Sequence, residues 1–541
     1  MIPLHTVENV KFAEQRAVEA GVTESELMIR AASAMFHEIT EYFEDIGHAV
    51  ILAGPGKNGG DGIVLATLLD GAGWSVDVWA WKRDDNAEVP VETESLEQII
   101  WVTGVQQLKE SLESADLVLD AVFGAGSRLE LPEDVIEAFG IVRDQQESGY
   151  LPVWAVDLPS GVSADTGEAG EDVLSADVTL TIGLPKIGLY QQPASGICGE
   201  IRLVDIGLIS AIEPKSASAC LLTSDLARRA LPDRRTGIHK RTAGTLLIIG
   251  GSPNYYGAPR LTGESAMRGG AGLVMIAAPS SIIAPIATTV PELTFLPLPV
   301  SEHASAAVRM AEIVGKRIDE HDALVIGPGL GTETPVPEFL GQLLGFGQPG
   351  RGGIGFGSFT DPDPVDPFTG RAVIDADGLN WLSGVEDWWK VLSGAELVLT
   401  PHAGELARLL DVERESIEAD PWKHASDAAK KFGQTVVLKH AHTVVASPEG
   451  PVYVAEYAPV GLATAGTGDV LAGLIGSMLA QGLSASDAAI AGVAIGSEAA
   501  LILQEWAGQT GYLASDLIAA IPEAREFVRT SQPLISVRNQ S

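Results

Sequence analysis

Residues 49–62 read AVILAGPGKNGGDG, and this stretch decides the fold. It begins with an apolar run typical of a buried strand, continues into a glycine-rich turn at 54–62, and leads into a helix predicted from Ile63. Strand, glycine-rich turn and helix form the phosphate-binding arrangement of a doubly wound parallel sheet. The need for a tight turn explains the glycines, but it does not explain the side-chain oxygens of Asn58 and Asp61.

The same alternation of strands and helices extends through the first half of the chain. Residues 8–46 predict two helices that break at 21–23, with Thr23 as the N-cap of the second. The expected fold class is therefore α/β, with a Rossmann-like doubly wound sheet in this half. Further strands are predicted at 75–81, 117–123, 154–157 and 178–182.

Polar residues follow several of these strands. Asp120 precedes a Gly-Ala-Gly turn, and Asp157 precedes a Pro-Ser-Gly turn that contains Ser160. Because ligands bind at the carboxyl ends of parallel strands, these residues should lie on one rim with Asn58 and Asp61. Such oxygens can hold a monovalent cation or leave one carboxylate free for acid–base chemistry. Each aspartate taken singly is more often a loop-capping residue.

The pattern loosens around residues 209–222, the best domain boundary, and the alternation then restarts. A strand at 244–249 leads to a small-residue helix from Gly257, as in a ribokinase-like αβα domain. Residues 345–370, rich in Gly, Pro and Asp, predict a flexible surface insertion. Further strands are predicted at 273–277, 323–326, 372–374, 396–399 and 435–438, and chemically distinctive turns follow them at 327–331, 375–377, 401–405 and 439–443.

A second glycine motif lies late in the chain, where residues 466–469 read GTGD before a long small-residue helix. Backbone N–H groups at a helix start, together with the helix dipole, make a site for anions. Asp469 would repel a phosphate, so it fits better as a base that takes a proton beside it. The alternative is an ordinary loop in which Asp469 is only the N-cap.

The composition limits the partners. The 541 residues suggest two or three domains, and 72 acidic against 35 basic residues give a formal net charge of −37. This excess argues against nucleic-acid and anionic-membrane partners, and it favours a protein that works in high salt over a merely acidic one.

Two cysteines are too few for a disulfide framework, so a reducing cytoplasm is expected. No signal peptide is expected at residues 1–11. No apolar run is expected to reach membrane-spanning length, because the best candidate, 488–503, is interrupted by polar and glycine residues.

Residues 1–210 resemble the epimerase domain of the NAD(P)H-hydrate repair enzymes. The matching motifs are Asn58-Gly59-Gly60-Asp61-Gly62, 120–124, 156–161 and 183–186 through 204–207. The resemblance implies that potassium is bound by Asn58, Asp120 and Ser160, and that Asp157 contacts the hydrated nicotinamide as the acid–base residue. It also implies further substrate contacts at Lys57, Asn58, Gly59, Gly60 and Asp61, and at Gly124, Ala125, Gly126, Ser127, Arg128, Leu129 and Glu130.

Residues 221–535 resemble the ADP- or ATP-dependent NAD(P)H-hydrate dehydratase domain of the same family, with the closest match from about 221 to 529. The motifs are those at 327–331, 401–405, 439–443 and 466–469. The resemblance implies contacts with the hydrate at Ala258, Gly329, His402 and Asp469, and with the nucleotide at Lys439, His440, Ala441, His442, Thr443 and Gly468.

The resemblance also implies the chemistry. Water added across the 5,6 double bond of the reduced nicotinamide leaves a 6-hydroxyl, which is a poor leaving group. Phosphorylation from ADP or ATP, with magnesium on the nucleotide phosphates, makes elimination easy, and Asp469 takes the hydroxyl proton. The first domain would supply the S epimer from the R epimer. Beyond small molecules, we expect a homo-oligomer.

Two alternatives remain at this point. The chain could be a ribokinase-type small-molecule kinase fused to a regulator, although residues 401–405 and 439–443 favour the repair family. Alternatively the first half could be a non-catalytic sensor, against which the intact Asp157 beside Asn58 and Ser160 argues.

Overall fold

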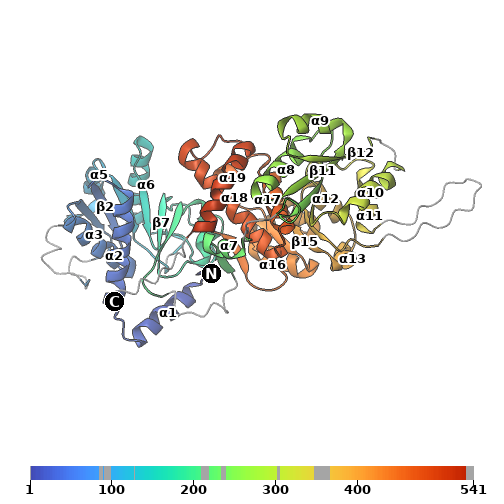
Figure 1. Ribbon diagram of the computed structural model, residues 1–541. Helices are drawn as coiled ribbons and strands as arrows, with labels where there is room; N and C mark the ends of the chain where they lie inside the picture. The colour runs from blue at the N-terminus through green and yellow to red at the C-terminus, as the bar shows by residue number, and fades with distance from the viewer. Residues whose placement is uncertain are drawn as a thin grey trace, which may run out of the picture. The chain divides into compact units, whose positions relative to one another are not determined.

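The chain forms two compact units, Ile2–Ala219 and Cys220–Ser541, which are described separately (Figure 1). The computed structural model describes residues 2–83, 89–90, 99–126, 128–208, 219–232, 239–300, 305–346 and 366–531. Ser127, most of the expected boundary segment and residues 347–365 of the expected insertion lie outside these ranges.

The first unit is built on a 7-stranded sheet in the order β4-β3-β2-β5-β6-β7-β8, parallel throughout. Its elements are β1 (Ile2–Pro3), α1 (Val7–Glu19), α2 (Glu24–Tyr42), β2 (His48–Ala53), α3 (Lys57–Gly71), β3 (Ser75–Ala80), β4 (Ile100–Val102), α5 (Gly104–Leu112), β5 (Leu117–Ala121), α6 (Glu133–Ser148), β6 (Val153–Val156), β7 (Val178–Ile182), η1 (Ile187–Tyr190), η2 (Ala194–Gly196) and β8 (Glu200–Val204). The predicted Rossmann-like class is confirmed.

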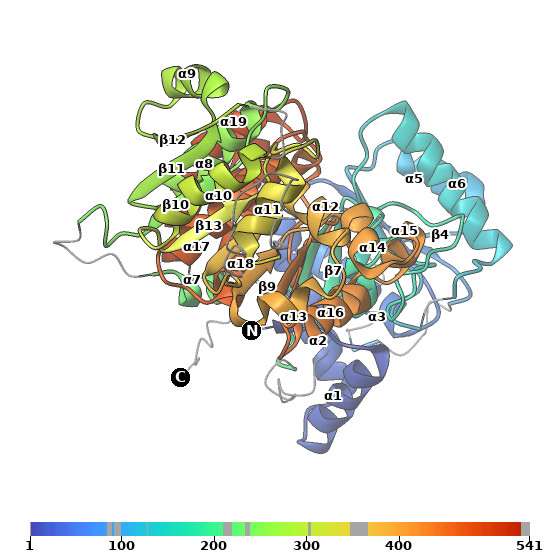
Figure 2. The same ribbon diagram turned by 90° about the vertical axis from the view of Figure 1, so that its right-hand side faces the viewer.

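Alternation along the strands supplies two cores in this unit. In β2, Ala49 and Ile51 pack with α2 and α3, while Val50 and Leu52 pack with α5 and α6 on the other face. Helices α5 and α6 lie next to each other (Figure 2). The predicted break between the first two helices is confirmed, since the Thr23 hydroxyl accepts from the backbone N–H of Glu26 at 3.1 Å.

Helix α3 begins at Lys57 and not at the predicted Ile63, so the glycine-rich residues form its first turns. The reason is close packing. A Cβ on Gly59 would lie 2.0 Å from the carbonyl oxygen of Gly54, which means that only glycine lets the helix start so near the strand end. The glycines therefore allow the backbone of α3 to lie close to the end of β2, in addition to forming the turn.

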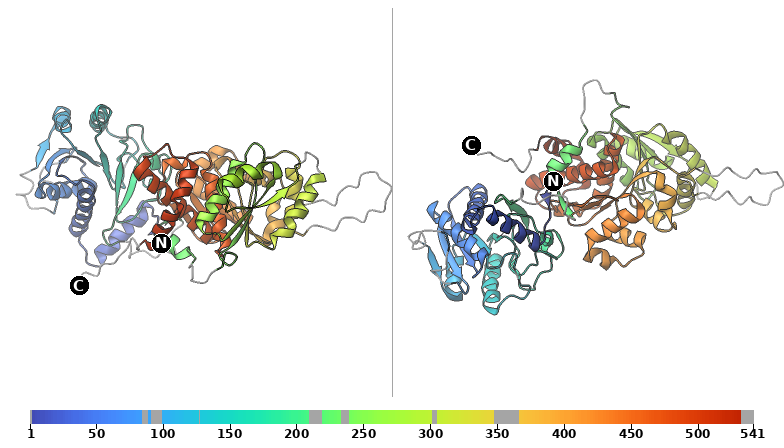
Figure 3. Two further views of the ribbon diagram at one scale, coloured as in Figure 1. Left: turned by 45° about the horizontal axis from the view of Figure 1, so that its top comes forward. Right: turned by 90° about the horizontal axis from the view of Figure 1, so that it is seen from below.

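In the second unit the strand order is β9-β18-β17-β16-β15-β14-β13-β10-β11-β12. Figure 3 shows helices of this unit, coloured green to red, packed around its strands. Every neighbouring pair in the series β12-β11-β10-β13-β14-β15-β16 is parallel. The pairs β16–β17 and β17–β18 are antiparallel. The elements are β9 (Ala219–Leu222), α7 (Ser224–Ala230), β10 (Thr245–Ile249), α8 (Gly257–Gly269), β11 (Leu273–Pro279), α9 (Ser280–Thr289), β12 (Thr294–Leu298), α10 (Ser305–Ile318), β13 (Ala323–Ile326), α11 (Val336–Leu344), β14 (Arg371–Ile374), α12 (Asp377–Ser383), α13 (Trp388–Val391), η5 (Leu392–Gly394), β15 (Glu396–Leu399), α14 (Ala403–Leu410), α15 (Arg414–Ala419), α16 (Pro421–Phe432), β16 (Thr435–Leu438), β17 (Val444–Ala446), β18 (Val452–Ala455), η6 (Val460–Leu462), α17 (Thr467–Ala480), α18 (Ala485–Ala507) and α19 (Ala514–Thr530).

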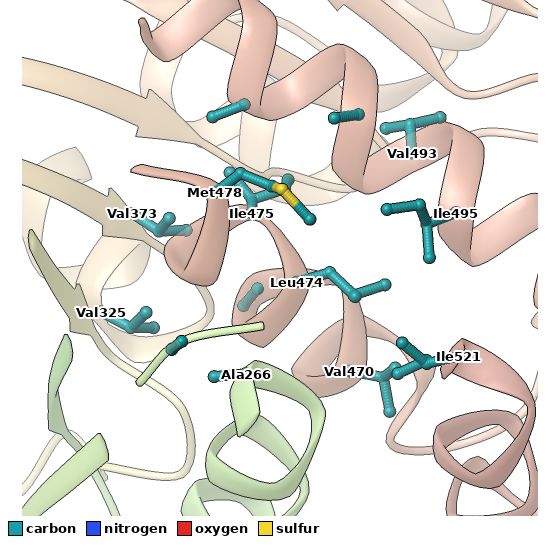
Figure 4. Close-up of a cluster of buried hydrophobic side chains, with 14 of the residues drawn as sticks. Ala266, Val325, Val373, Val470, Leu474, Ile475, Met478, Val493, Ile495 and Ile521 are labelled. Carbon is teal, nitrogen blue, oxygen red and sulfur yellow. The ribbon is translucent and has the colours of Figure 1, made fainter. Parts of the chain in front are cut away.

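Helix α17 lies at the centre of the second unit's core. Figure 4 shows its Leu474, Ile475 and Met478 among buried side chains from β13, β14, α8, α18 and α19. The helix packs closely against α8, and only glycine at position 473 allows this approach. A Cβ on Gly473 would lie 2.2 Å from the carbonyl oxygen of Thr262. Burial on every side explains why α17 is almost wholly small and apolar.

Helix α18 corrects the expectation about apolar length. It runs unbroken for 23 residues through Gly492, Gly496 and Glu498, and by length and composition alone it could cross a membrane. Since 67% of its most apolar window is buried, and it packs on α17 and α19, it is a core helix of this unit.

We expect Gly473→Ala to lower the unfolding temperature of the second unit, although alanine favours a helix by about 1 kcal/mol over glycine. The new methyl group would meet backbone, which cannot yield without shifting α8, at a cost of roughly 1–3 kcal/mol. Gly496→Ala is the matched control, because its Cβ would sit 3.7 Å from Leu474, an ordinary contact. Thermal unfolding of the two variants should move in opposite directions, and an equal response would contradict this packing.

Candidate active sites

The first candidate site lies where the strand order of the first sheet reverses. The chain runs from β2 outward to β3 and β4 and then returns to β5 on the other side of β2. The turns after β2 and β5 therefore diverge, and the crevice between them is the usual ligand position in such sheets. Asn58 follows β2, Asp120 ends β5, and Asp157 follows β6.

Asp120 and Ser160 form a buried hydrogen-bonded pair on this rim. The Ser160 hydroxyl donates to Asp120 Oδ1 at 2.7 Å, and the Ser160 backbone N–H donates to Oδ2 at 2.7 Å. The same hydroxyl accepts from the N–H of Phe123 at 2.8 Å. Burial raises the pKa of Asp120 to about 6, against the lowering effect of the bonds from Ser160.

Asn58, in the first turn of α3, is also buried. Its Nδ2 has no hydrogen-bond partner among the described residues. A Cβ on Gly124 would lie 3.1 Å from both Asn58 Oδ1 and Asp157 Oδ2, so Asn58, Gly124 and Asp157 meet at one point. The rim thus collects amide, carboxylate and hydroxyl oxygens, which are ligands that hard cations prefer.

Asp157 sits in the left-handed region with φ 70°, a strained conformation for a non-glycine residue. Its Oδ2 accepts from the N–H of Ala125 at 3.0 Å, and its Oδ1 accepts from the N–H of Ile182 at 3.2 Å. The buried Lys186 ammonium forms a short ion pair with the same Oδ1. The motif containing Lys186 was recognised in the sequence, but no role was predicted for it.

Two further carboxyl groups, those of Asp61 and Glu14, lie near enough to Asp157 to interact with it electrostatically. Burial, then Asp157 and Glu14, raise the pKa of Asp61 well above its usual range. Burial likewise raises the pKa of Glu14 in α1, although Lys57 opposes the rise. Sequence reasoning missed Glu14, because a glutamate on a helix reads as a solvated side chain. Lys57 is exposed, and its ammonium lies 3.1 Å from Glu24.

Among its described residues, the turn after β5 meets the site only at its start. Gly124 and Ala125 contact Asp157 or lie beside it. The rest of the predicted substrate loop within the described residues is exposed, namely Gly126, Arg128, Leu129 and Glu130.

The second unit repeats the arrangement. Its strand order reverses between β10 and β13, and the predicted contact residues again follow these strands. A Cβ on Gly329, which has φ 60°, would lie 2.9 Å from the Ala258 Cβ and 2.7 Å from the Tyr255 Cβ. Ala258 and Gly329 are therefore brought together, with the exposed Tyr255 beside them.

Lys439, at the end of β16, connects several carboxylates. Its ammonium donates to Asp375 Oδ1 at 2.9 Å and lies 3.7 Å from Glu405 Oε2. Burial lowers the pKa of Lys439, but the combined effect of Asp375 and Glu405 is larger and opposite, so the pKa of Lys439 is raised overall. A Cβ on Gly468 would be 3.6 Å from this nitrogen, so Lys439 lies beside the glycine motif at the start of α17.

Gly466, with φ 92°, occupies the N-cap position of α17, so the reading of Asp469 as the cap is wrong. Asp469 lies instead in the first helical turn. Burial and the nearby Asp375 raise its pKa to about 7, with Lys439 opposing them. A carboxyl group with this pKa can accept or release a proton near neutrality.

Asp375 and Asp377 flank Ala376, a second non-glycine residue with positive φ, here 46°. The two carboxylates have different neighbours: Asp375 Oδ1 accepts from the Thr400 hydroxyl at 2.7 Å and from the Lys439 ammonium. Asp377 Oδ2 accepts from the N–H of Gly331 at 2.8 Å, which connects the glycine turn after β13 to this carboxylate pair.

His402 forms the N-cap of α14 in a reciprocal capping box with Glu405. Its Nδ1 accepts from the N–H of Gly404 at 3.0 Å, while Glu405 Oε2 accepts from the N–H of His402 at 2.8 Å. Its side chain remains 54% exposed, and its Nε2 lies 3.6 Å from Glu405 Oε1.

The predicted nucleotide segment 439–443 is only partly accessible. His442 is buried, its Nδ1 lies 2.7 Å from the carbonyl oxygen of Ala455, and burial lowers its pKa to about 4. Its side chain therefore packs inside the unit, and the predicted nucleotide contact at His442 stays a prediction. His440 and Thr443 are half-buried and Ala441 is exposed.

Each of the two units matches a different family model. Residues 246–523 match the family model described as NAD(P)H-hydrate dehydratase, and residues 24–188 match that described as YjeF-related protein N-terminus. The chain is 33% identical to the bifunctional NAD(P)H-hydrate repair enzyme Nnr of Escherichia coli, covering 96% of this chain and 93% of that protein. The Dictyoglomus turgidum protein of the same name is 30% identical, over 97% and 98% of the two chains.

One solved structure is the ADP/ATP-dependent NAD(P)H-hydrate dehydratase from Bacillus subtilis, co-crystallized with ATP/Mg2+. It is 25% identical, covers 57% of this chain and 98% of that chain, and has a TM-score of 0.47.

Proposed function

Because the chain belongs to the family of bifunctional NAD(P)H-hydrate repair enzymes, we propose that its two units catalyse the two steps of that repair separately. Residues 1–210 would be an isomerase that interconverts the R and S forms of hydrated NADH or NADPH. Residues 221–535 would be a lyase that dehydrates the S form with ADP or ATP. The observation that carries this proposal is the presence of two separate rims, each with a carboxylate beside a glycine-rich helix start.

The first step concerns the carbon that bears the 6-hydroxyl, which is bonded to the ring nitrogen. Protonation of the hydroxyl allows it to leave as water while the nitrogen lone pair forms a double bond to that carbon. Water then adds to the opposite face and returns a proton. Asp157 is the proposed acid–base group, and the nearby Asp61, whose pKa is raised by burial, adds a second carboxyl group.

In the second unit, Asp469 is the proposed base that takes the proton from the 6-hydroxyl as the phosphoryl group is transferred to it. The phosphorylated oxygen then leaves readily as inorganic phosphate while C5 loses a proton, which restores the 5,6 double bond. Backbone N–H groups of the first α17 turn, around Gly468, and the Lys439 ammonium beside them can hold the transferring phosphoryl group. Ala258, Gly329 and His402 would contact the hydrate.

Two ions are part of the proposal. The all-oxygen set of Asn58, Asp120 and Ser160 fits potassium, because no cationic side chain within the described ranges pairs with the buried Asp120. Bound potassium would supply a compensating charge that keeps this rim ordered. In the described parts of the chain no group of three His, Cys, Asp or Glu side chains could hold a metal by itself, so magnesium would arrive with the nucleotide phosphates.

The single substitutions Asp157→Asn and Asp469→Asn should separate the two activities. A mixture of both epimers of hydrated NADH is incubated with magnesium and ADP or ATP, and recovery of the near-ultraviolet NADH absorbance is followed. Asp469→Asn should slow dehydration by at least about 10²-fold and leave epimerisation intact. With Asp157→Asn, recovery should pause once the S form is consumed. Equal loss of both activities in either variant would contradict two separate sites.

Dehydration should depend on pH through Asp469. Since its pKa is raised to about 7 and a base must be deprotonated, kcat should rise with pH through neutrality and level off above it. Asp377→Asn removes one of the negative charges that raise this pKa, so the midpoint should move to lower pH. A kcat that does not vary across neutral pH in the unsubstituted enzyme would exclude Asp469 as the base.

The acidic surface should make stability depend on salt. With a formal net charge of −37, self-repulsion is screened as the Debye length falls from about 10 Å at 0.1 M to about 3 Å at 1 M salt. We expect the unfolding temperature to rise from 0.1 M to 1 M NaCl, where no potassium is present to bind at the Asn58 rim, because screening does not require a particular cation. A flat or falling unfolding temperature would contradict adaptation to high salt.

A further inference from the structure

We propose that Lys186 is a positioning residue for epimerisation, which fixes the Asp157 carboxylate so that one chosen oxygen faces the substrate. This inference rests on the proposed acid–base role of Asp157. It assigns a function to a residue that the sequence motif contains but does not explain.

Lys186 has no capacity left to act on a ligand. Its side chain is only 1% exposed. An ammonium group has three N–H donors, and three acceptors surround this one: Asp157 Oδ1, Thr181 Oγ1 at 3.1 Å and the carbonyl oxygen of Ile182 at 2.7 Å. Lys186 therefore acts through its partners and does not deliver a proton to the substrate.

The two oxygens of Asp157 are made different by these contacts. Among the described residues, Oδ1 accepts from both the Lys186 ammonium and the N–H of Ile182, whereas Oδ2 accepts only from the N–H of Ala125. Oδ2 is also the oxygen beside Gly124, where a side chain would block it. Oδ2 consequently keeps a lone pair directed at the open rim, and Lys186 fixes the carboxylate in that rotation.

The position of Lys186 is itself set by the start of the chain. The N–H of His5 donates to the carbonyl oxygen of Pro185 at 2.9 Å, and the N–H of Ile187 donates to the carbonyl oxygen of His5 at 3.0 Å. His5 thus binds the backbone on both sides of Lys186. Burial and the adjacent Lys186 lower the pKa of His5 to about 4, so the imidazole stays neutral and adds no second positive charge.

The contacts explain why Asp157 tolerates its strained backbone. A positive φ in a non-glycine residue persists only where surrounding contacts hold it. Here three donors hold the carboxylate, and the ion pair is buried, where removal of one charge leaves the other uncompensated. Lys186 is thus the strongest of the contacts that keep Asp157 in its functional rotation.

The test uses the full-length Lys186→Met enzyme with the R epimer of hydrated NADH, after subtraction of spontaneous epimerisation. We expect kcat for epimerisation to fall roughly 10²-fold, the effect of misplacing a catalytic group by about 1 Å, while KM stays nearly constant. Dehydration of the S epimer serves as an internal control and should not change. Lys109→Met, which removes an exposed lysine of the same unit, should leave both activities unchanged.

Thr181→Val gives a second and milder test in case Lys186→Met does not fold. It removes one acceptor of Lys186 without removing a charge, and it should lower kcat by a smaller factor, again with KM unchanged. The positioning role would be overturned if either folded variant had the same kcat for epimerisation as the unsubstituted enzyme, or if only its KM rose. Full epimerisation by Asp157→Asn would instead refute the proposed role of Asp157, whatever the Lys186 variants do.

Discussion

Parallel strands that all end at one edge of a sheet are the constraint on which both sites depend. In each unit the strand order reverses once, between β2 and β5 in the first and between β10 and β13 in the second. The connections diverge at that point and leave room for a ligand. Helices that start directly after the strands aim their N-terminal N–H groups at the same space, so the rim favours negatively charged groups before any side chain is considered.

Both rims contain carboxylates at positions where the helix starts also attract anionic ligands, and both balance part of this negative charge in the same way. In each, a lysine donates to an aspartate at a strand end: Lys186 to Asp157 in the first unit, and Lys439 to Asp375 in the second. A strained non-glycine backbone accompanies each pair, at Asp157 and at Ala376. The lysine balances one carboxylate, while a neighbouring acid, such as Asp469 with its pKa raised to about 7, stays available for proton transfer.

Close backbone packing is the second common device. Glycines at the start of α3 and along α17 allow these helices to lie against strands and other helices at distances that no side chain would permit. The helix starts are thereby brought to the rims and held there by a core that is apolar on all sides of α17. The binding geometry thus depends on close packing both at the rim, where α3 starts, and along the buried helix α17.

The sequence by itself determined the two α/β units, the central strands of both sheets, the cap at Thr23 and the set of candidate residues after those strands, but it did not predict the outer strands β4, β8, β12, β17 and β18. The features that it determined depend on local periodicity and on residue types that act within a few positions of themselves. It did not determine the start of α3, because that depends on the contact between Gly59 and Gly54 across a turn. Only the tertiary structure decided that His442 is a core residue, that Glu14 shares the field of Asp157, and that Lys186 holds this carboxylate. Each of these depends on groups far apart in sequence that meet only after the strands have paired, and no local pattern records such a meeting.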